Sequence, residues 1–161
     1  MGNFRFPVFC ISLARESIAP GELLDQWQDR LGFNLGETPA ATSLFIGRVR
    51  GTTAAGLALE ALELEHYPGM TEGQLEQLAG SCAERHGAQA VLVVHRVGRL
   101  HPGEAIVVVA VMADRRGQAQ RCCQDLLEAL KHEAPFWKRE WAGGAGRWVG
   151  GNTPLERRPQ R

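Results

Sequence analysis

The sequence contains very little lysine. Of the eighteen lysine and arginine residues, only Lys131 and Lys138 are lysines. Arginine stays charged and binds carboxylate or phosphate through parallel donors, whereas lysine is a compact charge that loses its proton when it is desolvated. Lysines near a helix end are most often solvated groups that complement the helix dipole. The two lie in one short segment, KHEAPFWKRE, so a shared chemical role is the alternative.

Net charge is also absent, because eighteen basic residues balance eighteen acidic ones. Nothing in this balance attracts a nucleic-acid backbone or an anionic membrane. No stretch approaches the roughly eighteen apolar residues of a membrane span. The N-terminal apolar run is interrupted by Arg5, Pro7 and Arg15, unlike the core of a signal peptide. We therefore expect no nucleic acid, no membrane and a cytoplasmic location.

Cysteine is scarce and its spacing excludes the usual structural roles. Cys10 and Cys82 stand alone, and the adjacent Cys122 and Cys123 form no C-x-x-C pair. Neighbouring cysteines cannot easily bridge each other or ligate one ion. The spacing of His66, His95 and His101 does not suit a metal either. The sequence therefore predicts reduced thiols and no metal site.

The remaining composition is that of one globular domain. Apolar residues make up 44% of 161 residues, enough for a sizeable core without disulfide or metal staples. We assign residues 1–149 to the domain. Residues 150–161, GNTPLERRPQR with its preceding glycine, are rich in Gly, Pro and Arg, and we expect them to form a flexible basic tail that orders around a partner.

Hydrophobic periodicity predicts an α+β domain with a mostly antiparallel sheet. Thr71 and Gln74 suggest a capping box for the second helix, and Asp114 suggests an N-cap for the third. Pro135 should end that third helix at Ala134. The segment 97–103 is expected to be a loop. Strands are expected over 4–13, 42–50, 57–67, 90–96, 104–113 and 136–141, and helices over 21–32, 71–87 and 114–134.

Three motifs in order carry a resemblance to a known family. They are LEHYPGM at 64–70, HRVGRLHPGE at 95–104 and LKHEAPFWKRE at 130–140, with Gly-Arg-Trp at 146–148 behind them. Over roughly residues 42 to 149 the chain resembles the catalytic, large subunit of molybdopterin synthase. That resemblance implies an α/β-hammerhead-like fold, a homodimer within a heterotetramer, and no cofactor.

The same resemblance implies a chemistry. In that family a small ubiquitin-like subunit donates sulfur from its C-terminal Gly-Gly thiocarboxylate to cyclic pyranopterin monophosphate, which makes molybdopterin. Two anions must then meet, so cations should line the site. Lys131 and Lys138 match the family's catalytic positions. The substrate-binding positions that match are Phe45, Arg48, Val49, Arg50, Asp114, Arg115, Arg139 and Glu140.

Two features of this expected site are specific to the chain. Asp114 stands where the family usually has histidine, and an aspartate there would repel a phosphate, so helix capping is its better role. Lys131 should be desolvated against Phe136 and Trp137 and should carry the chemistry, whereas Lys138 should be a wetter, fixed cation. Replacing Lys131 with Arg is then expected to cost more activity than the same change at Lys138.

A second function class fits the same groove. A non-catalytic binding module for the C-terminal tail of a ubiquitin-like protein would also need a cationic groove. Only a sulfurtransferase needs lysine rather than arginine at residues 131 and 138. The retention of lysine there, in a chain that otherwise uses arginine, favours the enzyme.

Overall fold

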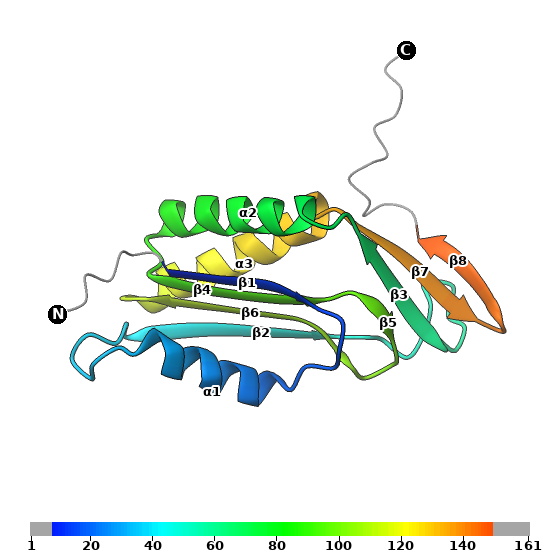
Figure 1. Ribbon diagram of the computed structural model, residues 1–161, viewed down its shortest axis with the longest axis horizontal. Helices are drawn as coiled ribbons and strands as arrows, with labels where there is room; N and C mark the ends of the chain where they lie inside the picture. The colour runs from blue at the N-terminus through cyan, green and yellow to red at the C-terminus, as the bar shows by residue number, and fades with distance from the viewer. Residues whose placement is uncertain (1–7, 150–161) are drawn as a thin grey trace, which may run out of the picture.

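Two four-stranded sheets make up the fold, which the computed structural model describes over residues 8–149. The tail predicted for 150–161 lies outside the described residues. Figure 1 shows the second sheet at one end of the first, with the helices on the first. In chain order the elements are β1 (Val8–Ala14), α1 (Pro20–Leu31), β2 (Ala41–Arg48), β3 (Ala61–His66), α2 (Met70–His86), β4 (Ala90–Arg96), β5 (Gly98–Leu100), β6 (Ala105–Ala113), α3 (Arg116–Glu133), β7 (Phe136–Ala142) and β8 (Ala145–Val149).

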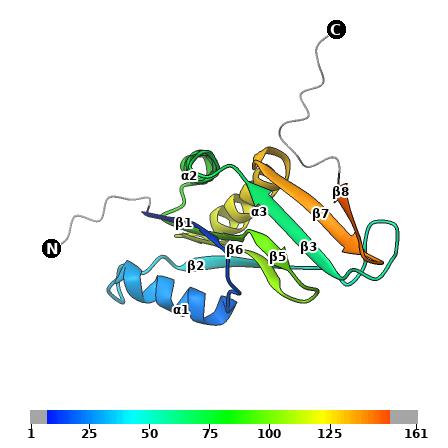
Figure 2. The same ribbon diagram turned by 45° about the vertical axis from the view of Figure 1, so that its right-hand side comes forward.

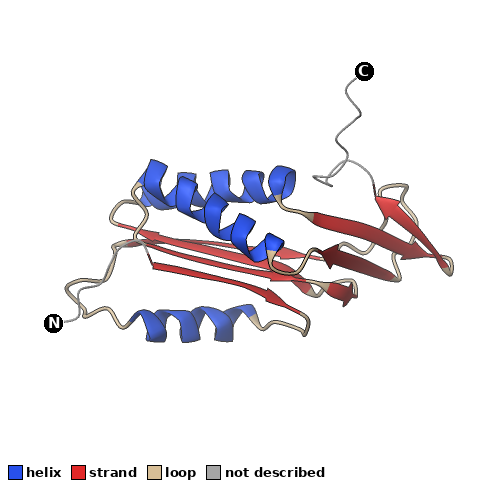
Figure 3. Cartoon of the chain, turned by 45° about the horizontal axis from the view of Figure 1, so that its top comes forward, coloured by secondary structure: helices blue, strands red, loops and turns tan. Residues whose placement is uncertain are grey.

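The first sheet has the strand order β1-β4-β6-β2 and is covered on both faces. Helices α2 and α3 lie on one face and α1 lies on the other (Figures 1 and 3). Val91 and Val93 pack with Leu126 of α3, while the alternating Leu92 packs with Trp27 of α1. Every residue of β4 is buried, which explains why its first five residues, 90–94, are continuously apolar instead of alternating.

Strand pairing confirms the predicted mostly antiparallel α+β architecture. Strand β1 pairs with β4 in parallel, whereas β4 with β6 and β6 with β2 are antiparallel. Every pair in the second sheet is antiparallel as well. The parallel pair joins segments separated by α1, β2, β3 and α2, so it needs no hairpin.

The second sheet has the order β5-β3-β7-β8 (Figure 2). Its strand β3 alternates as predicted, because Leu62 and Leu64 are in a small core with Leu100 while Glu63 and Glu65 are not. Two strands were not predicted. The first, β5, is a three-residue strand that lies in the expected 97–103 loop and begins at a glycine with φ 88°. The second, β8, has no buried residue.

Both predicted N-caps are wrong, whereas the predicted end of the third helix is confirmed. Helix α2 begins after Gly69, whose N–H donates to Glu72 Oε2 at 2.8 Å, so the cap lies two residues before Thr71. Helix α3 begins after Arg115, and no side chain caps it. At its C-terminus Ala134 is extended, with φ −70° and ψ 135°, as the following proline requires.

No helix in the described part of the chain is long and apolar enough to cross a membrane.

Candidate functional site

A pocket of about 320 Å³ opens where α3 and β7 meet the first sheet. We call it the lysine pocket, because both lysines of the chain line it. Its other walls come from β2, β4, β6 and α3 and are mostly apolar. The lining residues are Phe45, His95, Ile106, Val107, Leu127, Glu128, Leu130, Lys131, Ala134, Phe136 and Lys138.

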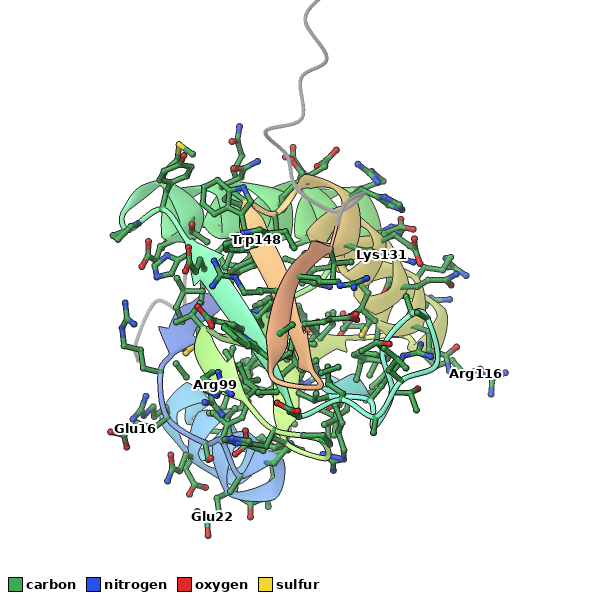
Figure 4. The ribbon with its side chains drawn as sticks, turned by 90° about the vertical axis from the view of Figure 1, so that its right-hand side faces the viewer. Glu16, Glu22, Arg99, Arg116, Lys131 and Trp148 are labelled. Carbon is green, nitrogen blue, oxygen red and sulfur yellow. The ribbon has the colours of Figure 1, made fainter. Side chains whose placement is uncertain are left out.

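The turn at Pro135 brings the two lysines together. Lys131 lies in the last turn of α3, where Figure 4 labels it, and Lys138 is the third residue of β7. The helix ends at Glu133 and the chain reverses into a strand, so two residues seven positions apart can line one pocket. The predicted placement of Lys131 in the last turn of the helix and of Lys138 in the extended segment after it is therefore confirmed.

The two lysines differ in burial, and the predicted difference is wrong. Lys131 is exposed and Lys138 is half-buried. Burial lowers the pKa of Lys138, the nearby charge of Lys131 lowers it further, and Glu140 opposes both effects. The ammonium that burial makes easier to deprotonate is thus that of the half-buried Lys138, whereas Lys131 is exposed at the helix end.

The two aromatic residues between the lysines also separate. Side chains alternate along β7, so Phe136 and Lys138 share one face while Trp137 and Arg139 share the other. Phe136 lines the lysine pocket, whereas Trp137 packs edge-on against Tyr67 at a centroid distance of 4.4 Å. The expected wall of two aromatics is therefore one aromatic, and Trp137 does not line the pocket.

His95 lies in the lysine pocket although the sequence marked it only as a strand-end residue. It is 9% exposed, and its ring stacks on Phe136 with centroids 4.0 Å apart and planes at 16°. Its Nδ1 is 2.8 Å from the Arg96 carbonyl oxygen. Burial, with a smaller effect of Lys138, lowers the pKa of His95 to about 4. Its place in the wholly buried AVLVVHR strand was the signal that could have identified it.

Residues 45–50 divide between the pocket and its surroundings. Phe45, 41% exposed on β2, lines the pocket. Arg48 and Arg50 are exposed at and beyond the strand end, next to an irregularity between Gly47 and Arg48. Val49 is 4% exposed and belongs to the small core of the second sheet. Of these four predicted site residues, only Phe45 lines the lysine pocket.

Arg139 and Glu140 follow Lys138 on β7 but lie on opposite faces. Glu140 shares the face of Lys138, two residues away, and its charge acts on that lysine. The Arg139 guanidinium lies 4.1 Å above the ring centre of Trp148 in β8, on the other face. Arg139 therefore braces the β7–β8 hairpin, and Glu140 tunes the charge of Lys138.

Asp114 and Arg115 lie far from the lysine pocket in the same chain. They are exposed just before α3, whose other end carries Lys131. At 1.5 Å per residue, the fifteen positions between Arg116 and Lys131 span about 22 Å of helix. One copy of the chain does not bring these predicted substrate-binding residues to its own lysines.

Other reactive groups in the described residues do not form a second centre. Residues 8–149 hold no group of three or more His, Cys, Asp or Glu side chains that could bind a metal ion. Burial raises the pKa of the thiols of Cys82 and Cys123, and that of Cys122 to about 12. A thiol that resists ionisation is a poor nucleophile, so these cysteines act as core residues.

Comparison with known proteins points to one family. The family model described as MoaE protein matches residues 17–133. A molybdopterin synthase catalytic subunit of Ralstonia nicotianae is 43% identical over 117 residues, which are 73% of this chain and 66%, about two thirds, of that relative.

Solved structures share the whole fold. The molybdopterin biosynthesis MoaE protein from Burkholderia ambifaria is 34% identical with a TM-score of 0.72, and the match covers 93% of each chain. A complex of subunits 1 and 2 of molybdopterin-converting factor from Helicobacter pylori contains a chain with a TM-score of 0.72 at 18% identity, covering 89% of this chain and 92% of that one. At that identity the likeness is one of fold.

Proposed function

The chain belongs to the MoaE protein family, and from that premise we propose that it is the catalytic subunit of a molybdopterin synthase. It transfers sulfur from the C-terminal thiocarboxylate of a small ubiquitin-like subunit to cyclic pyranopterin monophosphate. The observation that carries this proposal is the lysine pocket, in which the only two lysines of the chain meet against apolar walls.

The charges of the pocket fit two anionic reactants. A thiocarboxylate and a phosphorylated pterin repel each other, and the ammonium groups of Lys131 and Lys138 offset that repulsion. Apolar side chains such as Phe45 and Phe136 limit water and strengthen these interactions. A half-buried ammonium such as Lys138 is suited to stabilise negative charge that develops on the acyl oxygen.

The reaction has two chemical stages. The thiocarboxylate sulfur first attacks a carbon of the pterin side chain. The carbon–oxygen bond at that carbon breaks with its electron pair on the leaving oxygen, and the small subunit is then joined to the substrate as a thioester. Water then attacks the acyl carbon and the carbon–sulfur bond to the carrier breaks. The products of this stage are a carboxylate on the small subunit, a thiol on the substrate and one proton. No cofactor is required for either stage.

We propose that the active species is a homodimer within a heterotetramer, one small subunit serving each copy. Asp114 and Arg115 fall at family substrate positions but lie about 22 Å from Lys131 along α3. A second copy that presents its Arg115 to the lysine pocket of the first would reconcile the two observations. Arginine there would bind phosphate through its planar fork.

Mixing two defective variants tests this arrangement. Arg115→Ala and Lys138→Ala are each expected to be nearly inactive as homodimers. After mixing and subunit exchange, some heterodimers hold one pocket with an intact Lys138 and an intact partner Arg115, so activity should return. Sedimentation gives the oligomeric state beforehand. A monomer at micromolar concentration, or no recovery on mixing despite exchange, would contradict the shared site.

The decisive experiment for the function is reconstitution. The full chain is mixed with a thiocarboxylated small subunit and cyclic pyranopterin monophosphate, and molybdopterin is measured. Product formation is expected, whereas carrier binding without product would favour a tail-binding module. We also propose a cytoplasmic site of action, which suits the four free cysteines.

A further inference from the structure

We propose that His95 is a further catalytic residue of the lysine pocket, in which its unprotonated Nε2 accepts the proton of the water that hydrolyses the carrier–substrate thioester. The inference rests on the proposed sulfur transfer and assigns one step of it. Four observations carry it: the tautomer of the ring, its fixed position, its open nitrogen, and the shortage of other acceptors in the pocket.

The backbone selects the tautomer of His95. Its Nδ1 lies 2.8 Å from the carbonyl oxygen of Arg96. A carbonyl oxygen only accepts hydrogen bonds, so Nδ1 carries the hydrogen and donates it. In the neutral ring the hydrogen is then absent from Nε2, which keeps a lone pair. His95 is therefore held as a proton acceptor at Nε2.

The ring is also fixed in place. It stacks on Phe136 with centroids 4.0 Å apart, and Lys138 lies two residues beyond Phe136 on the same face of β7. Residues at this spacing are about 6.6 Å apart along a strand. The imidazole therefore stands beside the lysine whose ammonium would stabilise the acyl oxygen during attack by water.

The second nitrogen of the ring is left to accept a hydrogen bond. Within residues 8–149, Nε2 of His95 has no hydrogen-bond partner. Unlike Nε of Arg96, which is fully buried without a partner, Nε2 of His95 is not fully buried. An atom with neither a partner nor full burial reaches the pocket that its residue lines. Water or a bound reactant can approach it there.

Few other groups of the pocket accept protons. From α3 the titratable residues are Lys131 and Glu128, from β7 Lys138, and from β4 His95, whereas β2 and β6 supply apolar residues. The Glu128 side chain is 63% exposed and pairs at 3.4 Å with Nε2 of His132, so it lies at the solvent side. The acceptor in the interior of the described pocket is His95.

Bound anions would make His95 a stronger base at the required moment. In the free pocket burial and the charge of Lys138 keep the ring neutral, with a pKa lowered to about 4. An anionic reactant offsets the lysine charges and favours the imidazolium that forms when water loses its proton. As the carbon–sulfur bond breaks, its electron pair leaves on sulfur, and the imidazolium can return the proton to that thiolate.

The test separates the two chemical stages. His95→Gln is mixed with thiocarboxylated small subunit and cyclic pyranopterin monophosphate for a single turnover, and quenched samples are read by intact-mass spectrometry. We expect the covalent carrier–substrate adduct to form and accumulate, with its hydrolysis slowed by a factor on the order of 100. The matched control is His101→Gln, whose imidazole is 62% exposed outside the pocket and which should hydrolyse the adduct normally.

Each outcome decides one claim. A wild-type chain that makes no product overturns the proposed function, whereas normal wild-type turnover with no adduct in His95→Gln overturns only the role of His95. Nitrogen-15 NMR of His95 in the wild-type complex with its carrier decides the question even if the variant does not fold. An Nε2 without hydrogen between pH 6 and 8 supports the proposal, and an imidazolium throughout that range excludes a proton acceptor.

Discussion

The two ends of helix α3 each lie beside predicted site residues but have opposite characters. At the C-terminal end Lys131 borders a pocket with apolar walls, a half-buried Lys138 and a buried histidine. At the N-terminal end Asp114, Arg115 and Arg116 are all exposed, and the first turn has no acidic residue. Positive charge at a helix N-terminus opposes the dipole and costs about 0.3–1 kcal/mol per group. Burial lowers the pKa of Lys138 and His95 at the C-terminal end, whereas the charged side chains at the N-terminal end stay exposed to solvent.

Lys138→Arg is expected to give the largest effect. The change keeps a positive charge but removes an amine that loses its proton more readily than usual because of burial, and it places a larger group in a half-buried position. Turnover should fall by a factor on the order of 100, as expected when a donor aimed at the developing negative charge on the acyl oxygen is displaced. Single-turnover molybdopterin formation at saturating small subunit measures it.

The control for this prediction is affinity for the small subunit, which should change little because the charge remains. A rate near that of the wild type would show that charge alone matters at residue 138. A larger loss for Lys131→Arg would restore the ranking that the sequence suggested.

The sequence predicted what depends on residue type and local spacing. It predicted the end of α3 at Pro135, the alternation of β3 and the position of Lys131 in the last turn of the helix, because a proline and a period of two act within a few residues. It failed on the burial of Lys138 and on His95, since both depend on β4 and β7 packing around α3. The same cause explains β5, whose pairing with β3 joins residues more than thirty positions apart.

Acid should lower the stability of the chain, because His95 is buried as a neutral ring. His95 has a folded pKa of about 4 against an ordinary 6.5, so the unfolded chain binds more protons between these values. The stability contribution is complete above pH 6.5 and is lost as the pH falls through 4. Between pH 7 and pH 4.5 the wild type should therefore lose about 2 to 3 kcal/mol more stability than His95→Gln.

Urea denaturation at the two pH values measures this difference. The His101→Gln variant is the matched control, since it removes an exposed histidine and should follow the wild type. Equal acid sensitivity of His95→Gln and the wild type would mean that residue 95 is not buried as a neutral ring.

Lys131→Arg should have a moderate effect. The side chain is exposed at the helix end, so a guanidinium can be accommodated and its charge persists. We expect about a tenfold loss of turnover, or about 1.4 kcal/mol. Lys131→Ala adds a sharper readout, because it removes a charge that lowers the pKa of Lys138. The alkaline limb of the pH–rate profile should then move to higher pH, and an unmoved limb would mean that the two ammonium groups do not interact.

Asp114→Ala should have the smallest effect on stability. An aspartate that capped α3 would stabilise the chain by about 1 kcal/mol, and its removal would lower the free energy of unfolding by that amount. Here the N-cap is Arg115 and no side chain caps the helix, while Asp114 is exposed. The remaining effect is small: the Asp114 carboxylate interacts favourably with the positive end of the α3 helix dipole. Replacing an exposed side chain with alanine removes no packing.

The expected change in the free energy of unfolding for Asp114→Ala is under about 0.5 kcal/mol. Urea denaturation measures it, with Gly87→Ala as a positive control at a helix end. Gly87 ends α2 with φ 67°, and a Cβ there would lie 3.2 Å from Nε2 of Gln118. Gly87→Ala should therefore destabilise the chain by more than about 1 kcal/mol, which is the order of the cost of placing a side chain in the left-handed region. A loss at Asp114 as large as that at Gly87 would show that the aspartate does stabilise the start of α3. The two ends of the helix would then differ less than their exposure suggests.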